Sequence, residues 1–289
     1  MKTSTPPTNA AAHSRRAGRH LAGACAAGLF ALFTAAGALA ADFPQGLVLH
    51  FSFDEIGSGG TINDRSWRGN TGRATGLGWT ATSKQGGGVE FASTNSVILV
   101  HHTPVLNVTQ ATFAVWFKTA RADAAERWLL EKRPERGFAL SIAGDTLNAG
   151  SRGKLRAVVN GQAVLSDAAL ADGAWHHGAA TFDGAQVKLY VDGQLQKQLA
   201  PLRGTMAAND SKLAIGRNLS SPPPRAKDVS FAGSMDEVMI FNHALTAAEL
   251  EAVIAAAKPK FTKDQVARRL AELKDLLARG LILQELYDR

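Results

Sequence analysis

The sequence predicts an all-β protein, a two-sheet antiparallel sandwich of the jelly-roll type, followed by a short α-helical C-terminal hairpin. Three dipeptides, Asn160-Gly161, Asp183-Gly184 and Asp192-Gly193, separate runs of strand-forming residues, and such dipeptides are typical of tight β-hairpin turns. Residues 187–191 read VKLYV, with the alternation of a strand that buries one face. Many short strands of this kind in one domain favour two packed sheets.

The first 40 residues have the composition of a signal peptide. They contain four basic residues and no acidic residue, and an apolar run over 21–39 closes on Ala38-Leu39-Ala40, a small-x-small cleavage pattern. The alternative is an uncleaved membrane anchor, but the run is short and weakly hydrophobic for that role. We expect export by the Sec route, or by the twin-arginine route because of Arg15-Arg16. The mature chain would then be periplasmic or extracellular, without a transmembrane segment.

The main domain is expected over residues 41–257, with strands where apolar residues alternate with polar ones or form short runs between turns. In chain order, the expected strands are 47–53, 88–91, 97–100, 112–118, 128–132, 138–142, 155–159, 162–165, 176–182, 186–191, 194–199, 213–216 and 234–241.

Charge and cysteine content exclude several function classes. The whole chain carries a formal charge of +7, but residues 41–257 hold 20 basic and 20 acidic residues. A neutral domain lacks the electrostatic basis for nucleic-acid binding. The one cysteine, Cys25, lies in the expected signal peptide, so the mature chain has no disulfide, thiol nucleophile or thiolate metal site.

Five blocks of the sequence resemble the bacterial laminin-G-like, concanavalin A-like jelly-roll family, and they occur in the family's order. They are LHFSFDE (49–55), NDRS (63–66), TFAVWFK (112–118), WHHGAATFDGAQVKLYVDGQ (175–194) and FAGSMDEVMIFNHALTAAEL (231–250). The resemblance implies two packed antiparallel sheets, but it does not determine a ligand. One departure is Trp67, which stands where the family often has a small turn.

No motif predicts catalysis. Glycoside hydrolysis needs two carboxyl groups about 5 to 10 Å apart, whereas Asp54-Glu55 and Asp236-Glu237 are adjacent pairs whose members face opposite sides of a strand. The pair His176-His177 has the same geometry and cannot hold one metal ion. We therefore expect a protein that is not an enzyme, with a cryptic glycoside hydrolase or lyase as the alternative.

Calcium is the cofactor that the resemblance implies. Some relatives bind a calcium ion between the early Asp-x-Ser turn and the late Asp-Glu strand, which here implies Asp64, Asn70 and Asp236, with Asp54 or Glu237 as outer ligands. Loop carboxylates and carbonyls are suitable oxygen ligands for this ion. The alternative is that these residues only cap turns.

Three tryptophans are candidates for ligand binding. Trp67, Trp79 and Trp128 each stand among polar residues, and an exposed indole can stack on a sugar ring. The alternative is a structural role for each. The expected function is that of an exported recognition module for a carbohydrate or a cell-surface partner.

The tail, residues 258–289, is expected to be helical. Thr246 to Glu249 form a capping box that opens a short helix ending near residue 258. A second helix follows to about Arg279, with an apolar stripe made of Val266, Leu270, Leu273 and Leu277. With Gly280 and residues 281–289, this segment resembles the bacterial short C-terminal domain called SHOCT. Because the stripe cannot bury itself, residues 262–289 should dock on the sandwich or form a homo-oligomer, and a structural or assembly protein is the alternative function.

Overall fold

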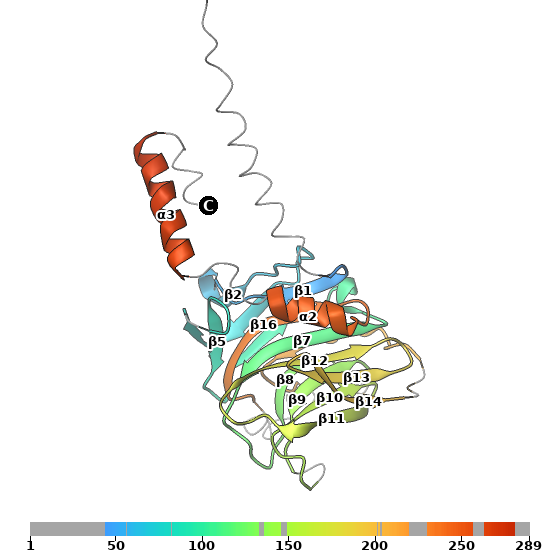
Figure 1. The fold of residues 1–289 in the computed structure, drawn as a ribbon. Coiled ribbons are helices and arrows are strands. Elements are labelled where there is room, and N and C mark those ends of the chain that lie inside the picture. The colour runs from blue at the N-terminus through green and yellow to red at the C-terminus, as the bar shows by residue number, and fades with distance from the viewer. Residues whose placement is uncertain are drawn as a thin grey trace, which may run out of the picture. The chain divides into compact units, whose positions relative to one another are not determined.

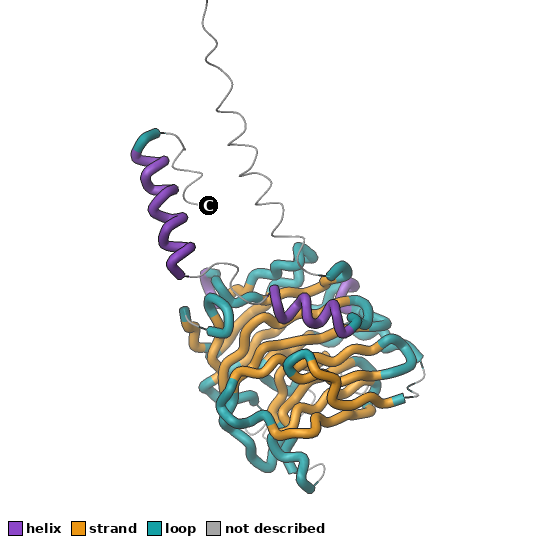
Figure 2. Tube along the Cα trace, viewed as in Figure 1, coloured by secondary structure: helices purple, strands orange, loops and turns teal. Residues whose placement is uncertain are grey.

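The structure is a computed structural model that describes residues 44–55, 57–81, 83–132, 136–145, 149–200, 202, 204–219, 230–256 and 263–280. Within these residues the chain forms two antiparallel sheets of eight strands each, which pack face to face as a sandwich (Figures 1 and 2). The predicted fold class is confirmed.

Sheet A contains β1 and β16, the first and the last strands of the described residues. Its order is β14 (Gln194–Leu199), β13 (Val187–Val191), β12 (Trp175–Phe182), β7 (Ala111–Lys118), β16 (Gly233–Phe241), β5 (Gly88–Phe91) and β4 (Gly78–Thr80), and β1 (Leu47–Phe51) also pairs with β16.

Sheet B forms the other layer. Its order is β11 (Gln162–Ala169), β10 (Lys154–Val159), β9 (Phe138–Ile142), β8 (Arg127–Lys132), β15 (Leu213–Ile215), β6 (Val97–Val100), β3 (Gly72–Thr75) and β2 (Thr61–Ile62). The 3-10 helices η2 (Ser58–Gly60) and η3 (Pro104–Leu106) lie in connections between strands.

The strands β2, β3 and β4 were not expected from the sequence. They are two to four residues long and include polar or glycine positions, so no alternation can build up over them. Their pairing with β6 and β5 shows that the longer neighbouring strands define them.

Two of the three predicted dipeptides form two-residue hairpin turns, whereas Asp183-Gly184 lies in a four-residue connection between β12 and β13. Asn160 and Gly161 have φ values of +49° and +76°, and Asp192 and Gly193 have +50° and +82°. Two successive residues with positive φ match the right-handed twist of the flanking strands. These turns join β10 to β11 and β13 to β14.

The main core lies between the sheets. Large aromatic side chains from both layers meet there, and the rings of Phe113 in β7 and Phe138 in β9 stack with their centroids 4.9 Å apart. Burial of such rings is the main stabilising contribution in a sandwich.

Helix α2 (Ala247–Ala256) covers part of the outer face of sheet A (Figure 1). Leu250 and Val253 pack there with Ala114, Met239 and Phe241. The predicted capping box is confirmed, because the N–H of Glu249 donates to Oγ1 of Thr246 at 3.3 Å and the N–H of Thr246 donates to Glu249 Oε2 at 2.8 Å.

Helix α3 (Lys263–Ala278) lies where the sequence predicts the first helix of the tail. The expected second helical piece and the expected signal peptide lie outside the described residues. Among the helices that the structure describes, none combines the length and the apolar character needed to cross a membrane.

Candidate ligand-binding site

Trp67 is the most exposed large apolar side chain of the described residues, with 86% of its surface open to solvent. It lies in the connection between β2 and β3, and its φ is +64°. A bulky residue in this left-handed region is strained, and such strain persists only where the surroundings hold the backbone. What holds this connection therefore decides whether Trp67 is presented rigidly.

Asp64 organises the connection that carries Trp67. Its Oδ1 accepts hydrogen bonds from the backbone N–H of His50 at 3.0 Å and of Ser66 at 2.9 Å, and its Oδ2 accepts one from the N–H of Asn70 at 2.9 Å. The N–H of Arg65 also donates to the backbone oxygen of His50, at 2.8 Å. The connection is thus tied both to itself and to the end of β1.

A buried pair anchors the end of β1 to β16. Nε2 of His50 and Oε2 of Glu237 lie 2.6 Å apart, and both side chains are buried. Glu237 has a φ of +51° and follows Asp236 at a bulge in the pairing of β16 with β7. The bulge turns the Glu237 carboxylate toward β1 instead of leaving it in the regular alternation.

Trp79 of β4 lies beside the same segment of chain. Its indole Nε1–H donates to the backbone oxygen of Phe53 at 3.0 Å, and 49% of its surface is exposed. Phe53 follows His50 by three residues, which is on the order of 10 Å of extended backbone. The supports of Trp67 and Trp79 therefore belong to one short stretch, residues 50–53, at the end of β1.

The structure corrects the expectation that Trp128 binds a ligand, because its side chain is buried. It lies in β8, is 7% exposed and packs against Ala139 and Val158. Its neighbour Arg127 is also buried, with Nη1 donating to the backbone oxygen of Ser230 at 3.1 Å. The polar flanks of Trp128 are therefore paired inside the protein, and the ring presents no open face to a sugar.

The residues of the expected calcium site have partners within the protein. The oxygens of Asp64 accept the three N–H groups above, Asn70 Nδ2 donates to the backbone oxygen of Val48 at 2.6 Å, and Asn70 Oδ1 accepts from Thr103 Oγ1 at 2.5 Å. In the part of the chain that the structure describes, no group of three or more His, Cys, Asp or Glu side chains could hold a metal ion. The donor set does not fit a calcium cluster as it stands, and calcium stays a prediction.

His176 and His177 point to opposite faces of β12, as the strand period predicts. His176 bonds Asp192 Oδ2 through Nδ1 at 2.9 Å and Asp172 Oδ1 through Nε2 at 3.2 Å. Burial alone would lower the pKa of His176, but these two carboxylates raise it above its usual value. His177 is fully buried on the other face, where desolvation lowers its pKa to about 4.

The sequence did not predict that His177 lies near Trp116 and Asp236. Trp116 of β7 is the register partner of both His177 and Asp236, and cross-strand partners project from the same face. We call Asp236, Trp116 and His177 the buried row. Burial raises the pKa of Asp236 to about 7. Only the register between three strands that are distant in sequence brings these residues together, so no local pattern could reveal the row.

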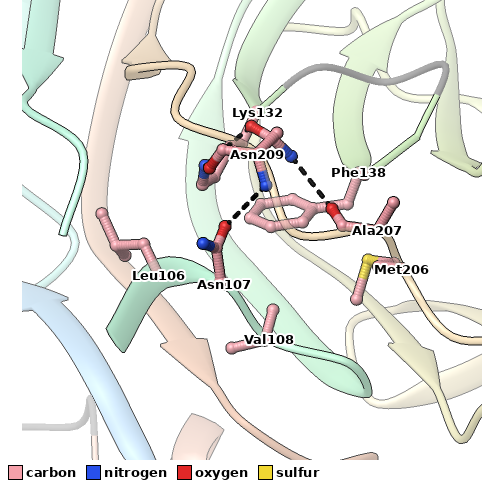
Figure 3. A pocket seen from close by; sticks show the side chains of 9 residues that line it. Leu106, Asn107, Val108, Lys132, Phe138, Met206, Ala207 and Asn209 are labelled. Atoms are coloured by element: carbon pink, nitrogen blue, oxygen red, sulfur yellow. Dashed lines mark hydrogen bonds between the residues drawn. The ribbon is translucent and has the colours of Figure 1, made fainter. Parts of the chain in front are cut away.

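A small pocket near Lys132 is occupied by contacts of the protein itself (Figure 3). Nζ of Lys132 donates to Asn209 Oδ1 at 2.9 Å and to the backbone oxygens of Asn209 and Ser211 at 3.1 and 3.0 Å. The N–H of Asn209 donates to Asn107 Oδ1 at 3.1 Å. Burial lowers the pKa of Lys132 to about 8. These hydrogen bonds hold the 207–211 segment to β8, so Lys132 and Asn209 serve the packing of the protein itself.

A comparison with protein-family models matches residues 91–251 to the model described as "Concanavalin A-like lectin/glucanases superfamily". A comparison with curated proteins found no match.

Solved structures share the fold at low sequence identity. The binding domain of Paraclostridial Mosquitocidal Protein 1 matches with a TM-score of 0.54 and 18% identity over 73% of this chain and 52% of that chain. Domain 4 of AbnA, a GH43 extracellular arabinanase from Geobacillus stearothermophilus solved in complex with arabinotriose, matches with a TM-score of 0.55 and 19% identity over 73% of this chain and 98% of that domain. The botulinum neurotoxin serotype D binding domain matches with a TM-score of 0.54 and 13% identity over 73% of this chain and 51% of that chain. The chain thus spans about half the length of the two toxin domains.

Proposed function

Because the chain belongs to the concanavalin A-like lectin/glucanases superfamily, we propose that it is a non-catalytic recognition module that binds a glycan through Trp67 and Trp79. Membership establishes the fold, whereas function depends on the site that the fold carries. The proposal therefore depends on the geometry of the two tryptophans.

The observation that carries the proposal is the exposed Trp67, whose backbone lies in a connection held by hydrogen bonds to Asp64. A large apolar ring with 86% exposure gains little from burial, and its positive φ adds strain. Folding stability therefore does not account for a tryptophan here. A ring presented by such a connection can stack on the apolar face of a sugar, and the backbone that carries it loses little conformational entropy on binding.

The similar structures support a binding role. Domain 4 of AbnA was solved in complex with arabinotriose, and the two toxin domains are described as binding domains. The shared fold alone does not transfer their ligands to this chain, so the identity of the glycan is part of the proposal.

The proposed mechanism involves no bond breaking. Asp236 is fully buried and accepts backbone hydrogen bonds from Gln85 and Glu237, while Glu237 is paired with His50. Neither carboxyl group of this adjacent pair faces solvent, where a general acid or base would meet a polysaccharide. Export to the periplasm or beyond, where such glycans occur, belongs to the same proposal.

We expect Trp67→Ala to weaken glycan binding about tenfold, because the main stacking surface is lost. Calorimetric titration of the mature chain with arabinotriose and a panel of other oligosaccharides measures the affinity. Leu195→Ala is the matched control, since it removes another exposed apolar side chain and should leave the affinity unchanged. Equal affinity of wild type and Trp67→Ala for every bound sugar, or no binding at all, would contradict the proposal.

Self-association through the tail is a second candidate function. Leu270 of α3 is exposed, as expected for an apolar stripe without a packing partner within one short helix. If residues 262–289 form oligomers, light scattering of the mature chain should give a multiple of the monomer mass, and deletion of residues 259–289 should restore the monomer. An unchanged mass would exclude the assembly role.

A further inference from the structure

The buried row lies on the outer face of sheet A, beside the area that α2 covers. Trp116 follows Ala114 by two residues in β7, and His177 precedes Ala179 by two residues in β12, so the pairs share a face. Ala114 and Ala179 pack under α2. Trp116, His177 and Asp236 nevertheless are only 6%, 1% and 0% exposed, because another segment covers them.

That segment is Ser83–Gly87, which we call the cover. Lys84 places its Nζ 4.1 Å from the centroid of the Trp116 ring. The N–H of Gln85 donates to Asp236 Oδ2 at 2.8 Å, and the N–H of Gly87 donates to Asp54 Oδ1 at 3.2 Å. A third bond, from the N–H of Ser83 to the oxygen of Gly86 at 2.9 Å, closes a turn within the cover. The cover is thus a compact turn that is held by a hydrogen bond to β16, a hydrogen bond to Asp54 and a cation–π contact with β7.

The closed arrangement leaves polar atoms without partners. Nε1 of Trp116, Nδ1 of His177 and Oε1 of Gln85 are buried and make no hydrogen bond. Leaving such atoms unpaired when they are removed from water is unfavourable. The row therefore has an unused donor on the indole, and an unused ring nitrogen on His177, next to a ring face that already accepts an ammonium group.

The cover is in contact with the support of Trp79. A Cβ atom at Gly87 would lie 2.6 Å from the backbone oxygen of Phe53 and 3.1 Å from Trp79 Nε1. Gly87 is thus packed against the hydrogen bond that holds the Trp79 ring. A glycan that contacts Trp79 would reach the end of the cover.

We propose that the cover closes a second glycan subsite, in which an amino sugar replaces Lys84 on the ring of Trp116. The sugar's ammonium group takes the position of Lys84 Nζ over the indole, and its hydroxyl groups meet the free Nε1 of Trp116 and Nδ1 of His177. This inference rests on the proposed function in taking the ligand to be a glycan.

The row suits a cationic sugar. The face of an indole attracts a cation, and Lys84 Nζ already lies 4.1 Å from the centroid of the Trp116 ring. The N–H of Gln85 would lose its bond to Asp236 as the cover opens, and a hydroxyl group of the sugar would replace it as the donor to Asp236 Oδ2. A neutral sugar would have no cation to place over the ring.

The test replaces Lys84, whose ammonium group lies over the ring of Trp116. Lys84→Ala should bind the trisaccharide of glucosamine about tenfold more tightly than wild type in calorimetric titration at neutral pH, because the ligand no longer competes with Lys84. The trisaccharide of N-acetylglucosamine, which has no ammonium group, should show no such gain. Binding of the amino sugar should also accelerate hydrogen exchange of the Gln85 amide.

Two matched variants separate this effect from a change in net charge. Lys84→Arg keeps a cation over the ring and should show no gain. Lys118→Ala removes a lysine from the same face of β7, two residues beyond Trp116, and should also show none. Equal affinity of wild type and Lys84→Ala for the amino sugar, or an equal gain in Lys118→Ala, would overturn the inference.

The test on Lys84 and the test on Trp67 can fail separately. A gain in Lys84→Ala, with the same affinity in wild type and Trp67→Ala for every bound sugar, supports the second subsite and refutes the role of Trp67. Weaker binding in Trp67→Ala together with no gain in Lys84→Ala gives the opposite result.

Discussion

Replacing His50 with leucine is expected to lower the free energy of unfolding by about 3 to 5 kcal/mol, because it breaks a buried pair and leaves one charge without its partner. His50 Nε2 lies 2.6 Å from Glu237 Oε2, and both side chains are buried. The backbone bonds that His50 makes to Asp64 and Arg65 do not depend on its side chain. Urea unfolding of the mature chain, followed by tryptophan fluorescence, measures the loss.

The double variant His50→Leu/Glu237→Met provides the control. It removes both members of the pair, so it should recover a substantial part of the stability lost in the single variant. A double variant as unstable as His50→Leu would show that the loss comes from packing around His50 and not from the unpaired carboxylate.

Replacing Asp64 with alanine is expected to cost about 3 kcal/mol of unfolding free energy, because three backbone N–H groups lose a charged acceptor. The same change should weaken glycan binding about tenfold although Trp67 is retained, since the connection no longer holds the strained Trp67 backbone in place. Urea unfolding and calorimetric titration measure the two effects. Asp64→Asn keeps one acceptor oxygen and should lie between wild type and alanine. Unchanged glycan affinity in Asp64→Ala would show that the connection does not position Trp67 for binding.

Wild type and Asp64→Ala also test the calcium prediction for Asp64, Asn70 and Asp236. If calcium binds there, it should raise the thermal midpoint of wild type relative to a chelator-treated sample, and it should have no such effect on Asp64→Ala. Equal midpoints of wild type with calcium and with chelator would contradict the prediction.

Local patterns explain which parts of the fold could be predicted. The alternation in β13 and the Asn160-Gly161 and Asp192-Gly193 turns are properties of adjacent residues, and each appears in the structure as expected. The capping box at Thr246 is equally local. The strands β2, β3 and β4 escaped prediction because they form by pairing with longer strands and not by a pattern of their own.

The candidate site also contains residues whose exposure follows from local sequence and residues whose burial depends on the fold. The polar surroundings of Trp67 made it a candidate for an exposed ring, and the structure exposes it, since that connection lies at the surface. The same criterion failed for Trp128, because Arg127 is bonded to Ser230 inside the protein and the ring packs on Ala139 and Val158. Polar neighbours in sequence indicate exposure only where they remain unpaired in the fold.

By itself, the sequence determined the sandwich and the hairpins at Asn160-Gly161 and Asp192-Gly193, and it gave an exposed Trp67 as one of two alternatives, because hydrophobic period, turn chemistry and local polarity act over a few residues. Only the tertiary structure decided that Asp64 and His50 hold the Trp67 connection, that Trp128 is buried, and that Asp236, Trp116 and His177 form one row beneath Lys84. These relations depend on strand register and on contacts between segments up to 187 positions apart. Such contacts form only when the sheets assemble, so no stretch of sequence contains them.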